Sequence, residues 1–206
     1  MSDKRLSGAI LAGGQSSRMG ENKAFVTVGG VPIIERVIAQ VRPLVGELKI
    51  ITNSPEVYEH LGLPLHRDIL PGKASLGGLY TAIETAAADY TLVVSCDQPF
   101  LNPNLLRYLN GLRQGYDVVV PLNRDDYPQS MHAIYDKACA APIRQCLEAD
   151  RLKIIGFFPD VKVREVRSEE IDRYDPQRWS FINVNTPEDL DRARELAPLI
   201  DRSAKE

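Results

Sequence analysis

The sequence predicts an α/β fold: a single three-layer, Rossmann-like domain with a mainly parallel sheet. Short apolar runs bounded by Gly, Pro and Asp alternate with segments of helical period along most of the 206 residues. Such alternation is typical of parallel sheets covered by helices on both faces. A glycine-rich stretch, Gly13–Gly20, directly follows the first predicted strand. Apolar residues make up 44% of the chain, enough for one core of this size.

In the first half of the chain, Thr91–Ser95 is the clearest buried strand. Pro32 is expected to open a helix as its first residue, where a missing N–H costs nothing and the backbone angle is preset. The predicted strands of this half are Ser7–Leu11, Leu48–Thr52, Leu65–Asp68 and Thr91–Ser95. Its predicted helices begin at Pro32, lie near Glu56–Leu61 and, after a long loop, span Leu79–Ala87.

The second half has a looser pattern. Its predicted strands are Asp117–Pro121, Met131–Tyr135, Val161–Val166 and Ser180–Val184, and the third of them alternates apolar with charged residues as a half-exposed strand does. Its predicted helices are Leu105–Leu112, Lys137–Ala149 and Pro187–Leu196. No linker or internal repeat divides the chain, so we expect one domain over residues 1–206 with a core at about 7–197.

Composition excludes several classes of protein. Charged residues make up 26% and the net charge is only −3, which argues against a disordered chain and against a broad nucleic-acid-binding surface. The apolar runs are far too short to span a bilayer, and the N-terminus lacks the apolar segment of a signal peptide. Cys96, Cys139 and Cys146 are odd in number without CxxC spacing, so they indicate neither a disulfide framework nor a zinc site. We therefore expect a cytoplasmic protein without nucleic-acid or membrane partners.

The segment Leu11–Lys23, LAGGQSSRMGENK, carries most of the functional information. Its glycines allow a close approach of backbone N–H groups to an anion. Arg18 can form paired hydrogen bonds to phosphate, and Lys23 supplies a point charge. The spacing matches neither a P-loop nor the GxGxxG of dinucleotide-binding folds. On this pattern alone, a plain turn between a strand and a helix remains the alternative.

Polar residues follow two other predicted strands. Asp97, in SCDQPFL, comes directly after a buried strand, where ligands bind in open α/β folds. Hard cations prefer oxygen ligands such as this carboxylate, although a turn aspartate before Pro99 is the alternative interpretation. In FINVNTPEDL, the pair Thr186 and Pro187 suits a helix start. Asn183 and Asn185 alternate onto one face of the predicted strand end and lack such an explanation.

Three of these segments resemble one family. LAGGQSSRMGENK resembles the signature LAGGxxxRMGxxK of the molybdenum cofactor guanylyltransferases, which belong to the nucleotidylyltransferase superfamily. SCDQPFL is similar to that family's CDxPFL, and FINVNTPEDL to its N[VI]NTPEDL. The resemblance covers residues 7 to about 197 and implies the fold of the nucleotide-diphospho-sugar transferases.

The resemblance also implies roles for individual residues. Arg18 and Lys23 would hold the phosphates of GTP and would be catalytic together with Asp97, the ligand of Mg²⁺. Asn185 would be a second magnesium ligand and would lie with Asn183 at the acceptor.

The GTP-binding residues that the resemblance implies are Leu11, Ala12, Gly13, Gly14, Lys23, Asn53, Asp68 and Asp97. The backbone of the first three would contact guanine. A carboxylate at Asp68 suits the N1–H and amino donors of guanine and would repel the acceptor edge of cytosine. Asn53 has a second interpretation as a turn residue before Ser54 and Pro55.

The implied reaction transfers GMP from GTP to the terminal phosphate of the molybdenum–molybdopterin cofactor, with transient contacts to other assembly proteins as a further expectation. A pterin cytidylyltransferase and a sugar-1-phosphate nucleotidylyltransferase remain alternatives, although they more often have alanine where this chain has Gly13. A non-catalytic nucleotide-binding regulator is another, disfavoured by the joint presence of Arg18, Lys23, Asp97 and Asn185. The segment Gln129–Tyr135 departs from the family pattern, which leaves the acceptor-side loop unassigned, and we interpret His132 as packed or capping rather than as a base.

Overall fold

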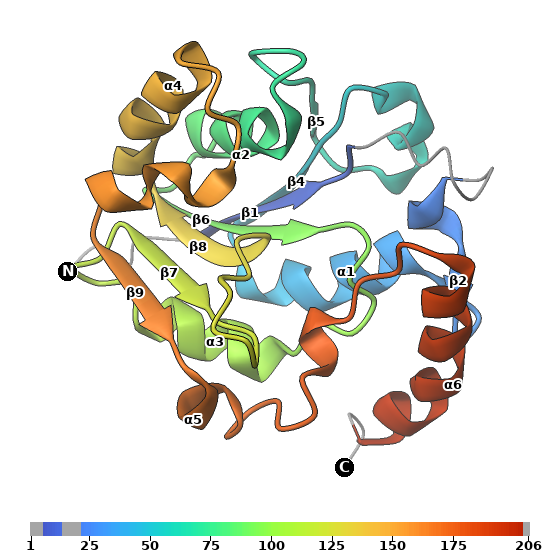
Figure 1. Cartoon of the computed structure of the whole chain (residues 1–206). Coiled ribbons are helices and arrows are strands. Elements are labelled where there is room, and N and C mark those ends of the chain that lie inside the picture. Colours follow the sequence, from blue (N-terminus) through green and yellow to red (C-terminus); the bar gives the residue numbers. More distant parts are fainter. Residues whose placement is uncertain (1–5, 14–21, 204–206) are drawn as a thin grey trace.

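Figure 1 shows a computed structural model of the chain, which describes residues 6–13 and 22–203. A sheet of seven strands has the order β5-β4-β1-β6-β8-β7-β9. All of them are parallel except β8, which pairs antiparallel with both β6 and β7. The strands are β1 (Leu6–Leu11), β4 (Glu47–Ile51), β5 (Leu65–His66), β6 (Tyr90–Ser95), β7 (Val118–Pro121), β8 (His132–Asp136) and β9 (Val163–Val166).

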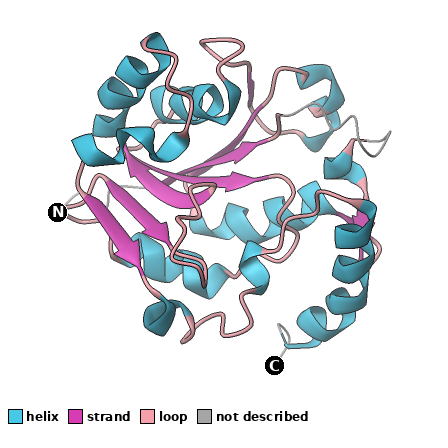
Figure 2. Cartoon of the chain, in the orientation of Figure 1, coloured by secondary structure: helices cyan, strands magenta, loops and turns pink. Residues whose placement is uncertain are grey.

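Helices cover both faces of this sheet (Figures 1 and 2). Helices α1 (Ile33–Val41), α3 (Pro103–Gly111) and α6 (Pro187–Ser203) contribute to one hydrophobic core, and α2 (Ala74–Glu84) and α4 (Ala140–Glu148) to the other. Along β1, Ile10 belongs to the first core while Ala9 and Leu11 belong to the second, as the two-residue period of a strand requires. The predicted three-layer α/β fold with a mainly parallel sheet is confirmed.

Smaller elements complete the structure. A hairpin of β2 (Thr27–Val28) and β3 (Val31–Pro32), absent from the sequence-based prediction, lies beside α6 (Figure 1). Helix α5 (Ser168–Ile171) follows β9. Short 3-10 segments occur at Lys23–Phe25, Arg42–Leu44, Pro55–Val57, Glu59–Leu61, Lys137–Cys139, Ile154–Asp160 and Trp179–Phe181. Among the helices of residues 22–203, none combines the length and the apolar character that a membrane span requires.

Two helix starts differ from expectation. Pro32 is not the first helical residue, because it pairs with Thr27 in the hairpin and only then leads into α1. Helix α2 begins at Ala74 rather than at Leu79, since its glycines are helical: the Gly77 N–H donates to the Lys73 carbonyl at 3.0 Å. The predicted helix at Glu56–Leu61 is instead a pair of 3-10 turns.

The predicted strand Ser180–Val184 is wrong. The Asp175 carboxylate accepts hydrogen bonds from the backbone N–H groups of Trp179 and Ser180, at 3.1 and 2.9 Å, and this starts a 3-10 turn. The chain after this turn runs without strand pairing toward α6. Asn183 and Asn185 therefore do not share a strand face.

Candidate active site

The candidate site lies at the carboxyl ends of β1, β4 and β6, in the middle of the sheet. Strand β1 pairs with β4 on one side and with β6 on the other, so the order of the strands reverses direction at β1. Ligands of open α/β sheets bind at such a switch point. Residues following the three strands, namely Ala12, Gly13, Thr52, Asn53, Cys96 and Asp97, line the hollow there.

Two adjoining cavities share the wall formed by Gly13, Thr52, Asn53, Ser95 and Asp97. One, of about 760 Å³, also has Asn22, Lys23, Tyr58 and Asn185 in its lining; we call it the Lys23 cavity. The other, of about 610 Å³, is bordered by Leu11, Asp68, Ser75, Gly78 and Met131; we call it the Asp68 cavity. Together they offer an elongated site for a ligand with two different ends.

Asp97 occupies the shared wall directly after β6. The Val184 N–H donates to its backbone carbonyl at 3.0 Å, which brings the C-terminal segment to the site. Burial raises the pKa of the Asp97 carboxyl, while a hydrogen bond with Ser95 and the charge of Lys23 oppose that shift. Its Oδ1 is buried and has no hydrogen-bond partner among the described residues. A buried carboxylate oxygen without a donor is well suited to a cation.

Lys23 joins the two ends of the chain. It begins the 3-10 turn Lys23–Phe25, and its ammonium donates to the backbone carbonyl of Asn185 at 2.6 Å and to the Asn185 side-chain oxygen at 3.3 Å. Lys23, Asp97 and Asn185 therefore come together in the structure: all three line the Lys23 cavity.

The start of α6 fixes the Asn185 segment. Asp189 Oδ2 accepts from the N–H groups of Asn185 and Thr186, both at 2.9 Å, and Thr186 Oγ1 accepts from the Asp189 N–H at 3.2 Å. This reciprocal cap confirms that Thr186 and Pro187 begin a helix. Asn183 lies differently, because its amide donates to the nearby Phe181 carbonyl at 3.2 Å and it borders neither cavity.

Asn53 and Asp68 form a pair at the Asp68 cavity. The Asn53 amide donates to Asp68 Oδ2 at 2.7 Å, and the Asp68 backbone N–H donates to Asn53 Oδ1 at 3.1 Å. A Cβ built on Gly78 would lie 3.4 Å from a Leu11 methyl and 3.7 Å from Asp68 Oδ1. The glycine thus leaves the helix backbone open to the cavity beside the second carboxylate oxygen.

The predicted residues of the glycine-rich loop are only partly described. Leu11 borders the Asp68 cavity, Ala12 borders the Lys23 cavity and Gly13 borders both. Gly14 and Arg18 lie outside the described residues.

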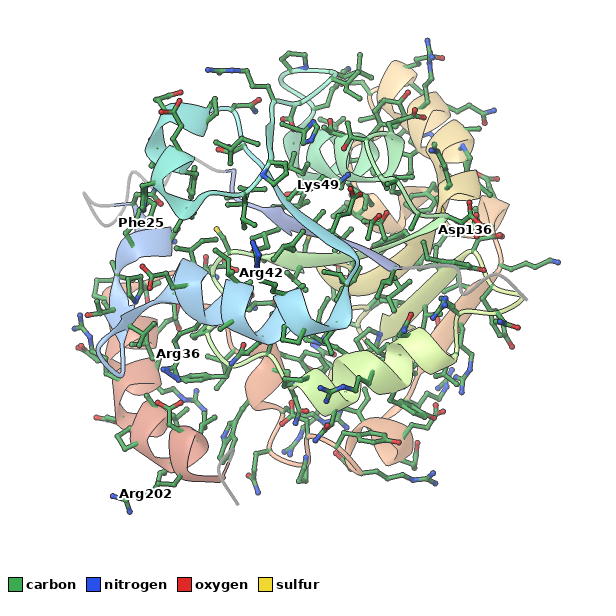
Figure 3. The ribbon with its side chains drawn as sticks, turned by 180° about the vertical axis from the view of Figure 1, so that it is seen from behind. Phe25, Arg36, Arg42, Lys49, Asp136 and Arg202 are labelled. Atoms are coloured by element: carbon green, nitrogen blue, oxygen red, sulfur yellow. The ribbon has the colours of Figure 1, made fainter. Side chains whose placement is uncertain are left out.

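A buried arginine of α1, Arg36, holds the loop that carries Asp97 (Figure 3). Its guanidinium donates to the Pro99 carbonyl at 3.3 Å and to the Val28 carbonyl at 3.1 Å, and it pairs with Asp201 of α6. It also lies over the Phe100 ring, with its carbon 5.5 Å from the ring centroid. No sequence pattern pointed to this residue, because an arginine at one helical position carries no sign of its burial.

His132 is buried and borders neither cavity. Burial lowers its pKa to about 3, and its ring meets Phe181 edge-on with centroids 5.2 Å apart. Neither ring nitrogen has a hydrogen-bond partner among the described residues. This geometry agrees with a packed, neutral histidine.

The chain is similar to known proteins of one family. The family model described as "MobA-like NTP transferase domain" matches residues 8–158. A relative from Pelotomaculum thermopropionicum named "Probable molybdenum cofactor guanylyltransferase" is 39% identical over 190 residues, 92% of each chain. One from Desulfosudis oleivorans named "Molybdenum cofactor guanylyltransferase" is 31% identical over 190 residues, 91% of this chain and 94% of the relative.

A solved structure is also similar. Molybdopterin-guanine dinucleotide biosynthesis protein A from Archaeoglobus fulgidus has a TM-score of 0.81 and 27% identity, with 94% of this chain and 99% of that one covered. The chain therefore belongs to the MobA-like NTP transferase family, with the molybdenum cofactor guanylyltransferases among its relatives.

Proposed function

We propose that this protein transfers GMP from GTP to the terminal phosphate of molybdenum–molybdopterin, giving the guanine dinucleotide form of the cofactor and pyrophosphate. Family membership supports nucleotidyl transfer, and the names of the relatives support this donor and acceptor. The observation that carries the choice of base is the Asp68 carboxylate, held by Asn53 with one oxygen directed toward a cavity lined by Gly13 and Gly78. The proposed location is the cytoplasm, a reducing compartment in which three free cysteines are expected to stay unpaired.

In this proposal guanine occupies the Asp68 cavity. Its N1–H and 2-amino group would donate to Asp68, and its flat ring would lie near Gly13 and Gly78, where no side chain intervenes. Adenine has an acceptor at N1 and no 2-amino group, so it would leave Asp68 Oδ1, the oxygen that Asn53 does not bind, without a donor. An unpaired buried polar group is what gives hydrogen-bonding sites their selectivity.

The phosphates would then cross the shared wall toward Lys23. Its ammonium would leave the Asn185 side chain for phosphate oxygens, and Arg18 would add a second cation. Fixed positive charges aimed at the leaving pyrophosphate stabilise the transition state without reorganisation.

Magnesium is part of the proposal, with Asp97 and the Asn185 side-chain oxygen as its protein ligands. When bound, Mg²⁺ supplies positive charge to the α-phosphate. The described ranges 6–13 and 22–203 contain no cluster of three His, Cys, Asp or Glu side chains able to hold a metal. One carboxylate and one amide still fit this ion, because it commonly keeps substrate phosphates and water in its remaining positions.

The acceptor requires no general base from the protein. The second pKa of a phosphate monoester is about 6, so roughly nine-tenths of it is dianionic at pH 7. Its oxygen would attack the α-phosphorus in line, forming the new P–O bond as the bond to pyrophosphate breaks. The neutral, enclosed His132 fits a reaction in which no imidazole takes part.

The direct test is pyrophosphate release from each of the four NTPs, with and without molybdenum–molybdopterin, at several Mg²⁺ concentrations. We expect release only with the acceptor, with Mg²⁺ and preferentially with GTP. Equal use of CTP would favour the cytidylyl alternative. Nucleotide binding without turnover under every condition would favour a regulator and overturn the proposal.

A further inference from the structure

The position of Lys23 depends on the short 3-10 turn that contains it, in addition to the contacts of its own side chain. It belongs to a 3-10 turn held by two backbone hydrogen bonds: Phe25 N–H donates to the Asn22 carbonyl at 3.0 Å, and Val26 N–H donates to the Lys23 carbonyl at 3.4 Å. Asn22 adds a cap, because its Oδ1 accepts from the Ala24 N–H at 3.1 Å. So short a turn depends on its cap and on packing.

Both the cap and the packing converge on one tyrosine. The Asn22 amide donates to the Tyr58 hydroxyl at 3.2 Å. On the other side of Lys23, the Phe25 ring lies 5.4 Å from the Tyr58 ring and 5.3 Å from that of His60, centroid to centroid. Figure 3 shows Phe25 beside the 3-10 turns of residues 55–61.

Tyr58 is itself well fixed. It is only 4% exposed and lies between the turns Pro55–Val57 and Glu59–Leu61. Its N–H donates to the Pro55 carbonyl at 2.8 Å, and its carbonyl accepts from the Leu61 N–H at 3.0 Å. Tyr58 borders the Lys23 cavity together with Asn22.

We infer that Tyr58 and Asn22 are positioning residues for Lys23. The hydroxyl of Tyr58 orients the Asn22 amide, Asn22 caps the turn, and the turn directs the Lys23 ammonium across the cavity toward Asn185. This inference rests on the proposed function, in which Lys23 binds the transferred nucleotide's phosphates. It adds two residues to the machinery that act through the lysine and not on the substrate.

The test is a double-mutant cycle on turnover with GTP. Tyr58→Phe removes one hydroxyl and keeps the ring that packs on Phe25. We expect a three- to tenfold loss of kcat, about the effect of one hydrogen bond. In a Lys23→Ala background the same change should alter kcat by less than about twofold, because residues that act through one group are not additive.

Tyr108→Phe is the matched control. The Tyr108 hydroxyl donates to Glu170 at 2.7 Å from α3, on another part of the molecule. This change should leave turnover as it is in both backgrounds. A Tyr58→Phe loss that persists unchanged without Lys23 would show a general structural effect and overturn the inference.

A second measurement does not depend on activity. Hydrogen exchange at the Ala24 amide, followed by NMR, reports the Asn22 cap directly and should accelerate at least about threefold in Tyr58→Phe and not in Tyr108→Phe. Unchanged exchange at Ala24 would also overturn the inference. If the wild-type protein failed to use GTP, the proposed function would fail, while Ala24 exchange would still decide whether Tyr58 holds the turn.

Discussion

The ammonium of Lys23 lies closer to the backbone carbonyl of Asn185, at 2.6 Å, than to the side-chain oxygen of the same residue, at 3.3 Å. The shorter contact is made to a backbone atom, so it does not require the Asn185 side chain. The amide oxygen can therefore be removed while the lysine keeps its main partner, which separates the two roles that meet at this residue.

Asn185→Ala should weaken the response to magnesium. We expect the Mg²⁺ concentration at half-maximal turnover to rise roughly 10–100-fold, as for other residues that support a metal site, with activity recovering at high Mg²⁺. Asn183→Ala is the matched control, because the Asn183 amide bonds to the nearby Phe181 carbonyl. The acceptor role that the family resemblance implies for Asn183 predicts a higher KM for the acceptor with unchanged dependence on Mg²⁺. An identical magnesium response in Asn185→Ala and wild type would remove Asn185 from the metal site.

Lys23→Ala should lower turnover with every NTP by a similar factor. The triphosphate is common to all four nucleotides, so loss of a phosphate contact costs transition-state stabilisation and not base selectivity. The measurement is kcat/KM for GTP and ATP in wild type and variant. A variant that kept its rate and lost its preference for GTP would contradict this role.

Asp97→Asn should abolish turnover and make the protein more stable to heat at pH 7. Burial raises the pKa of Asp97 above the ordinary 3.8, so the folded state holds the proton more tightly than the unfolded state. The free energy of unfolding therefore falls as the pH rises from 3.8 through the folded-state pKa of Asp97. Above that pKa the full cost of ionising the buried carboxyl is present.

Melting temperatures of wild type, Asp97→Asn and the exposed control Asp125→Asn, measured without Mg²⁺ from pH 4 to 8, test this sign. Added Mg²⁺ should stabilise wild type and not Asp97→Asn, since a ligand raises the stability only of a protein that binds it. A less stable Asp97→Asn at pH 7, or one that retained turnover, would refute the assignment.

Much of the sheet is predictable from the sequence because buried parallel strands are short, apolar and bounded by turn residues. Thr91–Ser95 is such a run, and β6 spans Tyr90–Ser95. The same criterion fails at Ser180–Val184, which has the apolar composition of a buried strand in Phe181, Ile182 and Val184. There the Asp175 carboxylate accepts hydrogen bonds from backbone N–H groups that a strand would use for pairing, and these contacts are visible only in the folded structure.

The site divides in the same way. Asp97 is recognisable because it follows a strand, and Lys23 because it ends a glycine-rich loop. The contact between Lys23 and Asn185 joins positions 162 residues apart, which no local pattern encodes. Tyr58 is missed altogether, since a tyrosine in a short irregular segment looks the same whether its hydroxyl meets solvent or the cap of a neighbouring turn.

His132→Phe should keep turnover at pH 7 within about threefold and make the protein more resistant to acid. The folded-state pKa of about 3 lies below the ordinary 6.5, so between these values only the unfolded state binds the proton. The wild-type free energy of unfolding should therefore fall by up to about 1.4 kcal/mol per pH unit below pH 6.5 through this residue.

Urea unfolding at pH 7 and pH 5 measures that slope. Phenylalanine removes the titrating ring, so the variant should lose less stability between the two pH values. A folded His132→Phe protein without activity would instead identify His132 as an acid or base in the reaction.

Choice of base depends on Asp68, whose carboxylate is held by the Asn53 amide at 2.7 Å. We expect wild type to prefer GTP over ATP and CTP by at least about tenfold in kcat/KM, because only guanine offers two donors to a carboxylate. Asp68→Asn places an amide there, with one acceptor in place of two, and should reduce this preference while kcat with saturating GTP changes less. Asn53→Ala should move in the same direction, since it releases the Asp68 carboxylate without removing it.

Gly13→Ala tests whether a methyl group at position 13 crowds the base without destabilising the protein. A Cβ at position 13 would meet no described atom within 4 Å, so the variant should fold and melt like wild type. If a purine lies against this part of the backbone, the added methyl group should raise KM for GTP more than it raises KM for CTP. Competition among the NTPs for wild type, Gly13→Ala and Asp68→Asn gives the three preferences in one experiment. Equal use of GTP and CTP by wild type would end the guanylyl assignment, because the hydrogen bonds to Asp68 cannot form with a base that presents acceptors there.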